Sequence, residues 1–451
     1  MATPRISVII PAYNACRTLP ACLQSLAVSE TQPFEIIIVD DSSTDKTAEL
    51  VRDFGAMLLS TGGRKGPAHA RNLGAREAAG EVIFFIDSDV CIHRNTLTRL
   101  TFGFEANPEV DAIIGSYDDS PHEQDVLSMY RNLMHRYTHQ QGRREATTFW
   151  SGCGAIRRDV FLKYGGFDEG YGRPAIEDIE LGSRLVASGH KILLDRDLEV
   201  KHVKHWTFLN LVKTDVFDRG MPWTELILRD GRMSNDLNLE MSQRVSVALA
   251  FMLFAFALAA AVYYKGLFLV PLLASMLFAL ACYWTESGVS RGKGVKLVFG
   301  LSVGAFLWLS YTHHMISLMP PVLVGYLLLF IRYRYAYKTQ FVRKITGMAY
   351  GAYLIASLAF IARFLPTRVP VFCFYVMVLS IVAINHRFYI FLARRMGWLT
   401  ALAAIPFHLL FYFYSGLAFL IGIAMYLKKH FLKESRDEVV RPASEPVMRS
   451  K

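Results

Sequence analysis

The uneven distribution of apolar residues restricts the fold of this 451-residue chain more than any other feature. Hydrophobic residues make up 53% of the sequence, which is more than soluble proteins usually contain. Between Val245 and Thr285 the only charged residue is Lys265, whereas the first 240 residues have the mixed composition of a soluble domain. An apolar run of about 20 residues is long enough to cross a bilayer as a helix. Further apolar runs occupy residues 296–318, 319–331, 345–362, 369–384 and 398–426.

We therefore predict three parts: a soluble domain at 1–240, a transmembrane helical region of six or seven spans at 241–430, and a polar tail at 431–451. The run 398–426 is too long for one upright span and too short for two, so the side on which the chain ends stays open. Within this run, His408 is either a functional group at membrane depth or a partner in an interhelical hydrogen bond.

The net charge of +10 comes largely from basic residues between the apolar runs, at 291–296, 332–344 and 387–395. Basic segments next to membrane spans stay on the cytoplasmic side. The first residues lack the order of a signal peptide. We expect an integral protein of the inner or plasma membrane with a cytoplasmic soluble domain. Because the charge flanks apolar runs, the expected partners are membrane lipids and not nucleic acid, and the oligomeric state stays open.

Short apolar runs alternate with helical patterns in the first 90 residues. This alternation predicts a parallel sheet with helices on both faces, and ligands of such sheets bind beyond the carboxyl ends of the strands. The predicted strands are Ile6–Ile10, Glu35–Val39, Ala56–Leu59 and Val82–Ile86, and the predicted helices are Thr18–Ser29, Thr44–Phe54 and Gly66–Ala79.

Polar residues follow each of these predicted strands. Asp87 and Asp89 follow the fourth strand, and residues two apart in a strand point to the same side. Mg²⁺ and Mn²⁺ bind such oxygen ligands together with substrate phosphates, although Asp-Ser-Asp is also typical of a turn. The other strands lead to aromatic, acidic, and glycine-rich basic segments at 11–14, 40–43 and 61–66. This combination suits a nucleoside diphosphate, and the lack of GxGxxG and GK[ST] motifs there argues against an NAD site or a Walker loop.

Six motifs occur in order between Ser7 and Gly189: SVIIPAYN, IIIVDDSSTD, GPAHARNLGA, FFIDSD, GGFDE and AIEDIELGSRLVASG. Together they resemble the family 2 inverting glycosyltransferases. The resemblance implies an α/β GT-A domain, which is Rossmann-like and binds a nucleotide sugar, followed here by an all-α transmembrane region. Two departures stand out. The acidic residues that many relatives carry after Asn14 are missing. The QxxRW motif of processive polysaccharide synthases is also absent, and the nearest stretch contains only Arg219 and Trp223, which argues against polymer synthesis.

The resemblance also implies which residues bind the donor. Pro11, Tyr13 and Asp41 would bind the nucleoside with Asp40 close by, and Arg71 would face the diphosphate. The residues by themselves leave other interpretations open. Tyr13 could pack at the strand end, Asp40 and Asp41 could cap the following helix, and Arg71 could be a solvated helix residue.

The resemblance also implies which residues bind the metal ion and which residue acts as the general base. Asp87 and Asp89 look like the DxD pair that holds Mg²⁺ or Mn²⁺, with Asp89 as the direct ligand and Asp87 also on the donor side. Asp178 looks like the general base, although a carboxylate there could simply favour the first turn of a helix. His205 or His202 could complete the metal shell, or could lie at a surface.

The acceptor side is implied for four residues, Glu177, Gly152, Arg219 and Trp223. The glycines of the segment 150–154 could also serve only a turn. Several apolar residues nearby fit either helices on a membrane surface or ordinary core packing: Trp206, Phe208, Leu209, Trp223 and Leu226.

The sequence thus predicts a metal-dependent inverting glycosyltransferase that moves a sugar from a UDP- or GDP-sugar to a lipid-linked acceptor. A polyprenyl phosphate, a lipid-linked sugar or a glycolipid would fit. The alternatives are a processive polysaccharide synthase and a membrane protein that senses nucleotide sugars without catalysis.

Overall fold

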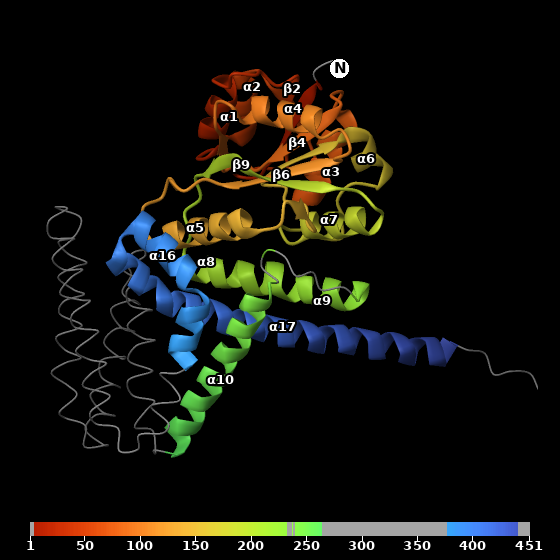
Figure 1. The fold of residues 1–451 in the computed structure, drawn as a ribbon. Coiled ribbons are helices and arrows are strands. Elements are labelled where there is room, and N and C mark those ends of the chain that lie inside the picture. Colours follow the sequence, from red (N-terminus) through yellow and green to blue (C-terminus); the bar gives the residue numbers. More distant parts are fainter. Residues whose placement is uncertain (1–3, 232–236, 238–239, 264–376, 441–451) are drawn as a thin grey trace, which may run out of the picture.

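The computed structural model describes residues 4–231, 237, 240–263 and 377–440 (Figure 1). Its first seven elements have the predicted types, with bounds that differ from the predicted ones by at most three residues. They are β1 (Ile6–Ala12), α1 (Leu19–Ala27), β2 (Glu35–Asp40), α2 (Thr47–Phe54), β3 (Met57–Ser60), α3 (Pro67–Glu77) and β4 (Val82–Ile86).

One nine-stranded sheet contains all strands of the described residues, in the order β3-β2-β1-β4-β8-β6-β9-β5, with β7 paired to β9. The strands β3, β2, β1 and β4 are parallel as predicted, whereas β8 runs antiparallel to both β4 and β6. The prediction of a parallel sheet is therefore right only for this first half. The later elements are β5 (Val90–Ile92), α4 (Thr96–Ala106), β6 (Ala112–Tyr117), α5 (Val126–Gln141), β7 (Glu145–Ala146), β8 (Cys153–Arg157), α6 (Arg158–Lys163), α7 (Glu177–Ala187) and β9 (Ile192–His202).

Helices cover both faces of the sheet, and the alternation along β1 shows why. Val8 and Ile10 point into a core shared with α1, α2 and α4, whereas Ile9 points into a core shared with α3, α6 and α7. The two faces of β4 divide in the same way. An apolar run buried on both faces is typical of central strands, and it brings the polar residues after β1, β2 and β4 to one edge.

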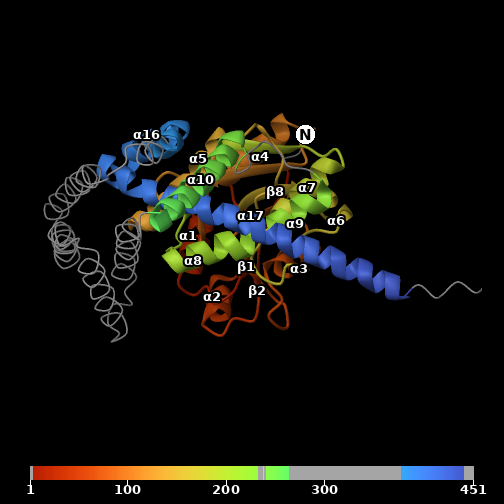
Figure 2. The same ribbon diagram turned by 90° about the horizontal axis from the view of Figure 1, so that it is seen from below.

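A second layer of helices lies beneath the sheet domain (Figures 1 and 2). Trp206 and Leu226 are buried within the protein, which supports core packing for these two, whereas Leu209 is 61% exposed. The helix α17 runs beneath α8 and α9 and packs against α9, α10, α16 and η1. The elements are α8 (Phe208–Lys213), the π-helix η1 (Thr214–Gly220), α9 (Met221–Asp230), α10 (Met241–Tyr263), α16 (His386–Met396) and α17 (Trp398–Val440).

The described residues contain one helix that is long and apolar enough to cross a membrane, Ala404–Lys429, within α17. The pair Met377–Ile384 and His386–Met396 would count as a second only if its 70° bend lies within one span. The other predicted spans between 264 and 376 lie outside the described residues, so the count of six or seven stays a prediction. The domain bounds at 240 and 430 also stay predictions. His408 is buried and lies 3.0 Å from the Tyr389 hydroxyl, as the interpretation of an interhelical hydrogen bond expects.

A buried ionic contact fastens α17 to the sheet domain. The guanidinium of Arg131 on α5 donates to Asp215 Oδ1 at 2.7 Å, and the hydroxyl of Tyr414 on α17 donates to Asp215 Oδ2 at 2.8 Å. Asp215 is 6% exposed. One carboxylate of η1 thus joins α5 to α17.

Replacing Asp215 with asparagine should destabilise the protein by about 3 kcal/mol, because Arg131 then remains buried without its counter-charge. Thermal unfolding of the full chain in an uncharged detergent measures this effect. The matched control is Tyr414→Phe, which removes one hydrogen bond and should cost about 1 kcal/mol. Equal melting temperatures for Asp215→Asn and Tyr414→Phe would contradict the expectation.

Candidate active site

Two loops at the carboxyl edge of the sheet hold residues in the left-handed region of backbone space. Asn14 follows β1 with a φ of 48°, and Ser42 follows β2 with a φ of 61°. Residues other than glycine rarely adopt such angles, which cluster at functional sites. The Asn14 side chain accepts a hydrogen bond from the backbone of Thr44 at 2.8 Å, so the two loops support each other.

Asp41 organises the glycine-rich loop that follows β3. Its carboxylate accepts hydrogen bonds from the backbone N–H groups of Lys65 at 2.8 Å and Gly66 at 2.9 Å, and it is 5% exposed. Asp41 therefore orders the loop, and the interpretation that it caps the following helix is wrong. Asp40 accepts the backbone N–H of Ser43 at 3.3 Å. Gly66 has a φ of 91°, and a side chain there would collide with the backbone of Gly172.

Tyr13 offers an aromatic face at this edge. Tyr13 is 36% exposed, and the guanidinium carbon of Arg64, from the glycine-rich loop after β3, lies 3.8 Å from the ring centroid. Arg64 also donates to the Tyr13 hydroxyl at 2.9 Å. Pro11, near the end of β1, is half-buried beside this residue. A flat cationic group already stacks on this ring, so the ring can also stack on a planar base.

Arg71 joins the two acidic motifs of the sequence. It is 4% exposed and donates to Asp87 Oδ1 at 2.6 Å and to Glu177 Oε1 at 2.9 Å. The interpretation of Arg71 as a solvated helix residue is therefore wrong. Burial raises the pKa of the Glu177 carboxyl above its ordinary value, although Arg71 opposes the shift. The segment around Asp87 and the segment around Glu177 thus share one edge of the sheet.

Asp89 lies beside a buried histidine. The antiparallel pairing of β5 with β9 places Val90 opposite His202, and His202 Nε2 is 3.7 Å from Asp89 Oδ1. Lys204 Nζ is 3.7 Å from the other oxygen. Burial acts to raise the pKa of Asp89, but His202 and Lys204 together hold it well below its usual range. Asp89 is thus kept as an anion.

No three acidic, histidine or cysteine side chains within the described part of the chain form a ready-made metal cluster. A magnesium-type ion needs only one or two carboxylates when substrate phosphates supply further oxygens. Asp87 and Asp89 fit that requirement. The histidine beside them is His202, because His205 lies 3.7 Å from Asp125 instead. The metal role predicted for His205 thus has no support from its position.

Asp178 is held in place at the start of α7. Its Oδ2 accepts hydrogen bonds from the backbone N–H of Ser151 at 3.0 Å and from the Ser151 hydroxyl at 3.1 Å, and its Oδ1 accepts from Ile179 at 2.8 Å. Ser151 precedes β8, whose Cys153 pairs with Ile86, the last residue of β4. This pairing brings Asp178 to the edge where Asp87 and Asp89 lie.

A row of aromatic side chains lies between the two acidic centres. The ring of Tyr117 stacks on His202 with a centroid distance of 4.2 Å and meets the ring of Trp150 at 4.9 Å. His135 on α5 packs on Trp150 at 4.4 Å. Gly152 has no room for a side chain, because an added Cβ would lie 2.7 Å from the Trp150 ring. Tyr117 and His135 belong to no motif, so sequence reasoning missed them.

The other predicted acceptor-side residues lie in the lower helical layer. Arg219 on η1 is 3.7 Å from Asp215 Oδ1, which is its ion pair within the described residues. Trp223 lies half-buried on α9. The structure ties Glu177 and Gly152 to the sheet edge but places Arg219 and Trp223 on a separate segment.

A titratable pair near this edge gives a pH prediction. His93 Nε2 lies 3.4 Å from Asp118 Oδ2, and the hydrogen bond to Asp118 raises the pKa of His93 above its ordinary value. The pair should therefore stabilise the fold fully below about pH 6.5, the ordinary histidine value, and lose this contribution as pH rises through the raised pKa. Because His93 is partly exposed, the effect should stay below about 1 kcal/mol. Thermal unfolding of wild type and His93→Gln at acidic and alkaline pH tests it, and a pH-independent difference would contradict it.

Comparison with known proteins identifies the first part of the domain that carries this edge. Residues 7–165 match the sequence model of the family described as "Glycosyl transferase family 2". The chain carries a family 2 glycosyltransferase domain. The matched residues have the predicted α/β architecture. Four of the six motifs lie within them, GGFDE begins at their last residue, and the motif with Asp178 begins at residue 175.

Curated relatives of the glycosyltransferase domain are similar over part of their length. An uncharacterized glycosyltransferase of Haemophilus influenzae is 29% identical over 173 residues, which are 36% of this chain and 55% of that protein. Poly(ribitol-phosphate) beta-N-acetylglucosaminyltransferase TarS of Staphylococcus aureus is 37% identical over 101 residues, which are 21% of this chain and 18% of that protein. The chain thus spans little more than half of the first of these relatives and less than a fifth of the second.

Among solved structures, mannosyltransferase PcManGT from Pyrobaculum calidifontis, in complex with GDP-Man and Mn²⁺, shares 22% identity. The alignment covers 70% of this chain and 88% of that one, with a TM-score of 0.46.

Proposed function

We propose that this chain is a metal-dependent inverting glycosyltransferase, which moves a sugar from a UDP- or GDP-sugar to a lipid-linked acceptor. The observation that carries the proposal is the placement of two separate carboxylate centres at one sheet edge. Asp87 and Asp89 follow β4, Asp178 lies in the first turn of α7, and Arg71 with Glu177 connects the two centres. Transfer chemistry needs one acidic centre for the donor and another for the acceptor.

The donor side would combine an aromatic ring that stacks on the nucleobase with two cations that face the diphosphate. Tyr13 supplies a ring on which the nucleobase stacks once Arg64 moves aside, and Pro11 forms the adjoining wall. The loop ordered by Asp41 supplies Arg64 and Lys65, two cations suited to the diphosphate. Asp40 and Asp41 are buried beside this loop, and their oxygens would shape the nucleoside site.

Asp87, Asp89 and His202 are the residues that would hold Mg²⁺ or Mn²⁺ beside the diphosphate. When bound, the ion offsets the negative charge of the departing nucleoside diphosphate. Lys204 lies 3.7 Å from Asp89, and Arg71 holds Asp87 in position. These contacts prepare the edge for a cation before the donor arrives.

Asp178 is the base that takes the proton from the acceptor hydroxyl as that oxygen attacks the anomeric carbon. The two bonds from Ser151 fix the orientation of the carboxylate in the first turn of α7. One base and one direct displacement invert the configuration at the sugar carbon. Trp150, next to Ser151, offers a ring surface for the acceptor.

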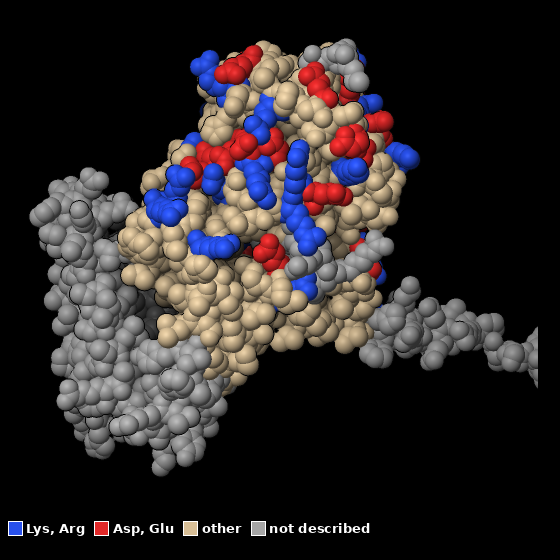
Figure 3. All heavy atoms as spheres, viewed as in Figure 1, with Lys and Arg blue, Asp and Glu red and all other residues tan. Residues whose placement is uncertain are grey.

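The membrane supplies the acceptor in this proposal. On the face shown in Figure 3, charged side chains gather over the sheet domain, and the surface over α10 and the adjoining part of α17 shows none. The candidate span Ala404–Lys429 lies directly beneath α9. The basic segment 387–395 packs against α5, which supports a common, cytoplasmic side for this segment and the sheet domain. A multi-spanning region would anchor the enzyme at its lipid substrate.

Transfer of labelled sugar into the organic phase tests the proposed acceptor. The purified full chain is incubated with a labelled nucleotide sugar, Mn²⁺ and extracted membrane lipids, and the lipids are then extracted. Label in the organic phase that depends on both the enzyme and the lipid extract supports the proposal. Label only in a water-soluble polymer would replace it with a polysaccharide synthase.

Replacing Asp89 with alanine should weaken binding of UDP or GDP in the presence of Mn²⁺ by a factor of 10 to 100, or about 1.4–2.7 kcal/mol. The reason is the loss of one of the two carboxylates that would hold the ion at the donor edge. Calorimetric titration with and without a chelator measures the effect, and Asp53→Asn on the exposed face of α2 is the control. Unchanged, metal-dependent affinity in Asp89→Ala would remove Asp89 from the metal site.

A further inference from the structure

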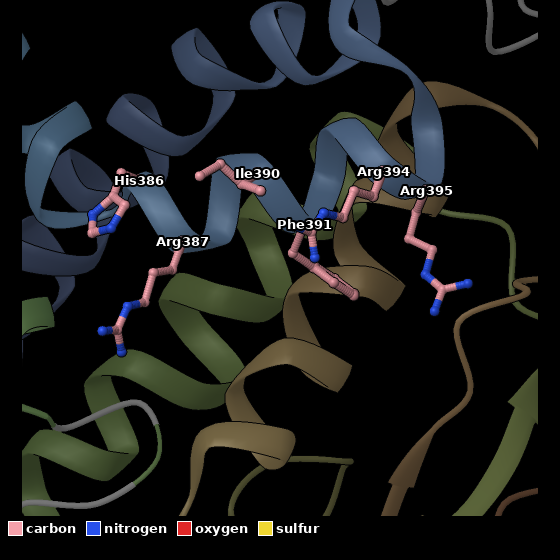
Figure 4. Close-up of a pocket in the computed structure, with 6 residues that line it drawn as sticks. All are labelled: His386, Arg387, Ile390, Phe391, Arg394 and Arg395. Carbon is pink, nitrogen blue, oxygen red and sulfur yellow. The ribbon is translucent and has the colours of Figure 1, made fainter.

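The helix α16 carries a surface of basic and apolar side chains that the proposed transfer reaction does not use. The side chains form two adjacent rows, because residues four apart lie on the same face of a helix. Together they line a surface pocket, and Figure 4 shows Arg387, Phe391 and Arg395 along one side of α16. The members of this α16 basic surface are His386, Arg387, Ile390, Phe391, Arg394 and Arg395.

Two of its three arginines have no acidic partner among the residues that the structure describes. Arg395 is paired with Asp119, which follows β6, at 2.6 Å, and this contact fixes α16 to the sheet domain. For Arg387 and Arg394, no ion pair occurs within the described residues, and both are exposed. Arg136 of α5 lies 6.0 Å from the Phe391 ring centroid, and its own acidic partners are Glu199 at 2.7 Å and Asp119 at 3.8 Å. Among the described residues, this surface therefore carries more positive than negative charge.

The position of α16 indicates where an anion for this surface would come from. The helix Met377–Ile384 precedes it after a 70° bend, and together the two are long and apolar enough to enter a membrane. Trp398 follows α16 with 66% of its surface exposed, and the candidate span begins at Ala404. Arginine next to apolar helices, with an exposed tryptophan, is typical of the headgroup level of a bilayer.

We propose that the α16 basic surface binds the phosphate headgroup of an anionic membrane lipid. The guanidinium groups of Arg387 and Arg394 donate paired hydrogen bonds to phosphate oxygens, a geometry that arginine matches better than lysine. Ile390 and Phe391, between the arginines, contact the apolar part of the lipid next to the phosphate. This site is separate from the sugar donor and acceptor, so it goes beyond the proposed function and does not depend on it.

Binding of a fluorescent short-chain phosphatidylglycerol to the full chain in an uncharged detergent tests the proposal. Wild type should prefer this lipid to phosphatidylcholine of the same chain length, and added salt should weaken binding. Arg387→Ala/Arg394→Ala should bind about 30-fold more weakly, since each basic residue contributes about 1 kcal/mol at an anionic surface and about 1.4 kcal/mol is tenfold. The charge-matched control Arg52→Ala/Lys163→Ala, on the exposed faces of α2 and α6, should bind like wild type.

Three results would overturn the assignment. Wild type could show no preference for phosphatidylglycerol over phosphatidylcholine. This result is measured on wild type alone, so it can be obtained even if the double variant misfolds. The double variant could fold, with wild-type melting temperature, and retain full affinity. Inorganic phosphate could displace the lipid at equal concentration, which would make free phosphate the ligand. Nucleoside diphosphate release is followed in the same samples, because its absence with intact lipid binding would count against the proposed function alone.

Discussion

Asp178→Asn should lower the rate of sugar transfer by a factor of about 10² to 10⁴, the usual contribution of a general base, while donor affinity stays within about twofold of wild type. Asparagine keeps the shape and can still accept the two Ser151 hydrogen bonds, but it cannot take the acceptor proton. Turnover at saturating donor, measured as nucleoside diphosphate release, separates the two quantities.

Two further variants sharpen this test. Asp159→Asn on the exposed face of α6 makes the same chemical change away from the sheet edge and should leave turnover unchanged. Ser151→Ala removes the hydroxyl that donates to Asp178 while its backbone bond remains, so it should slow transfer less than Asp178→Asn does. If Asp178→Asn turns over within tenfold of wild type, Asp178 is not the base.

Arg71→Met should destabilise the sheet domain by an amount near the upper end of about 3–5 kcal/mol. Methionine fills much of the same volume but leaves Glu177 buried without a counter-charge and releases Asp87. Thermal unfolding of the full chain in detergent measures the loss. Donor binding should weaken as well, because both acidic motifs lose their common partner.

The matched control is Arg76→Met, on the same helix but half-exposed and 3.8 Å from its carboxylate partner, which should cost less than about 1 kcal/mol. Adding Glu177→Gln to Arg71→Met removes the orphaned charge and should restore part of the stability. An Arg71→Met protein as stable as Arg76→Met would show that the buried ion pairs do not hold the edge together.

The first four strands could be predicted from the sequence because their signals are local. Val82–Ile86 is a continuous apolar run that ends abruptly at Asp87, and the observed strand has the same bounds. The polar residues at the ends of β1, β2 and β4 could be predicted for the same reason, because each directly follows an apolar run in the sequence. The alternation of strands and helices then fixed which edge they share.

Contacts between distant segments could not be predicted in this way. Ser151 holds Asp178 only because β8 inserts next to β4 in an antiparallel direction, and no local pattern announces that pairing. His202 lies beside Asp89 through the register of β5 with β9, whereas His205, three residues on, lies past the end of the strand. A sequence supplies both histidines but not the register.

The last apolar run shows a different limit. Hydropathy identified 398–426 as membrane-like, but it could not show that a single helix continues to Val440 and packs along α9 and η1. Gly422 lies against Thr224, and Tyr414 bonds Asp215, so specific contacts place this helix beneath the sheet domain. Apolar composition predicts burial or membrane contact without naming the partner.

Release of nucleoside diphosphate by the purified full chain tests the central claim most directly. A panel of UDP- and GDP-sugars is offered with Mn²⁺ or a chelator, and with or without extracted membrane lipids. The proposed function predicts release from one donor that requires both the metal and the lipid fraction and that disappears in Asp178→Asn. Release from no donor, by a protein that still binds UDP or GDP, would contradict catalysis and leave a nucleotide-binding membrane protein in its place.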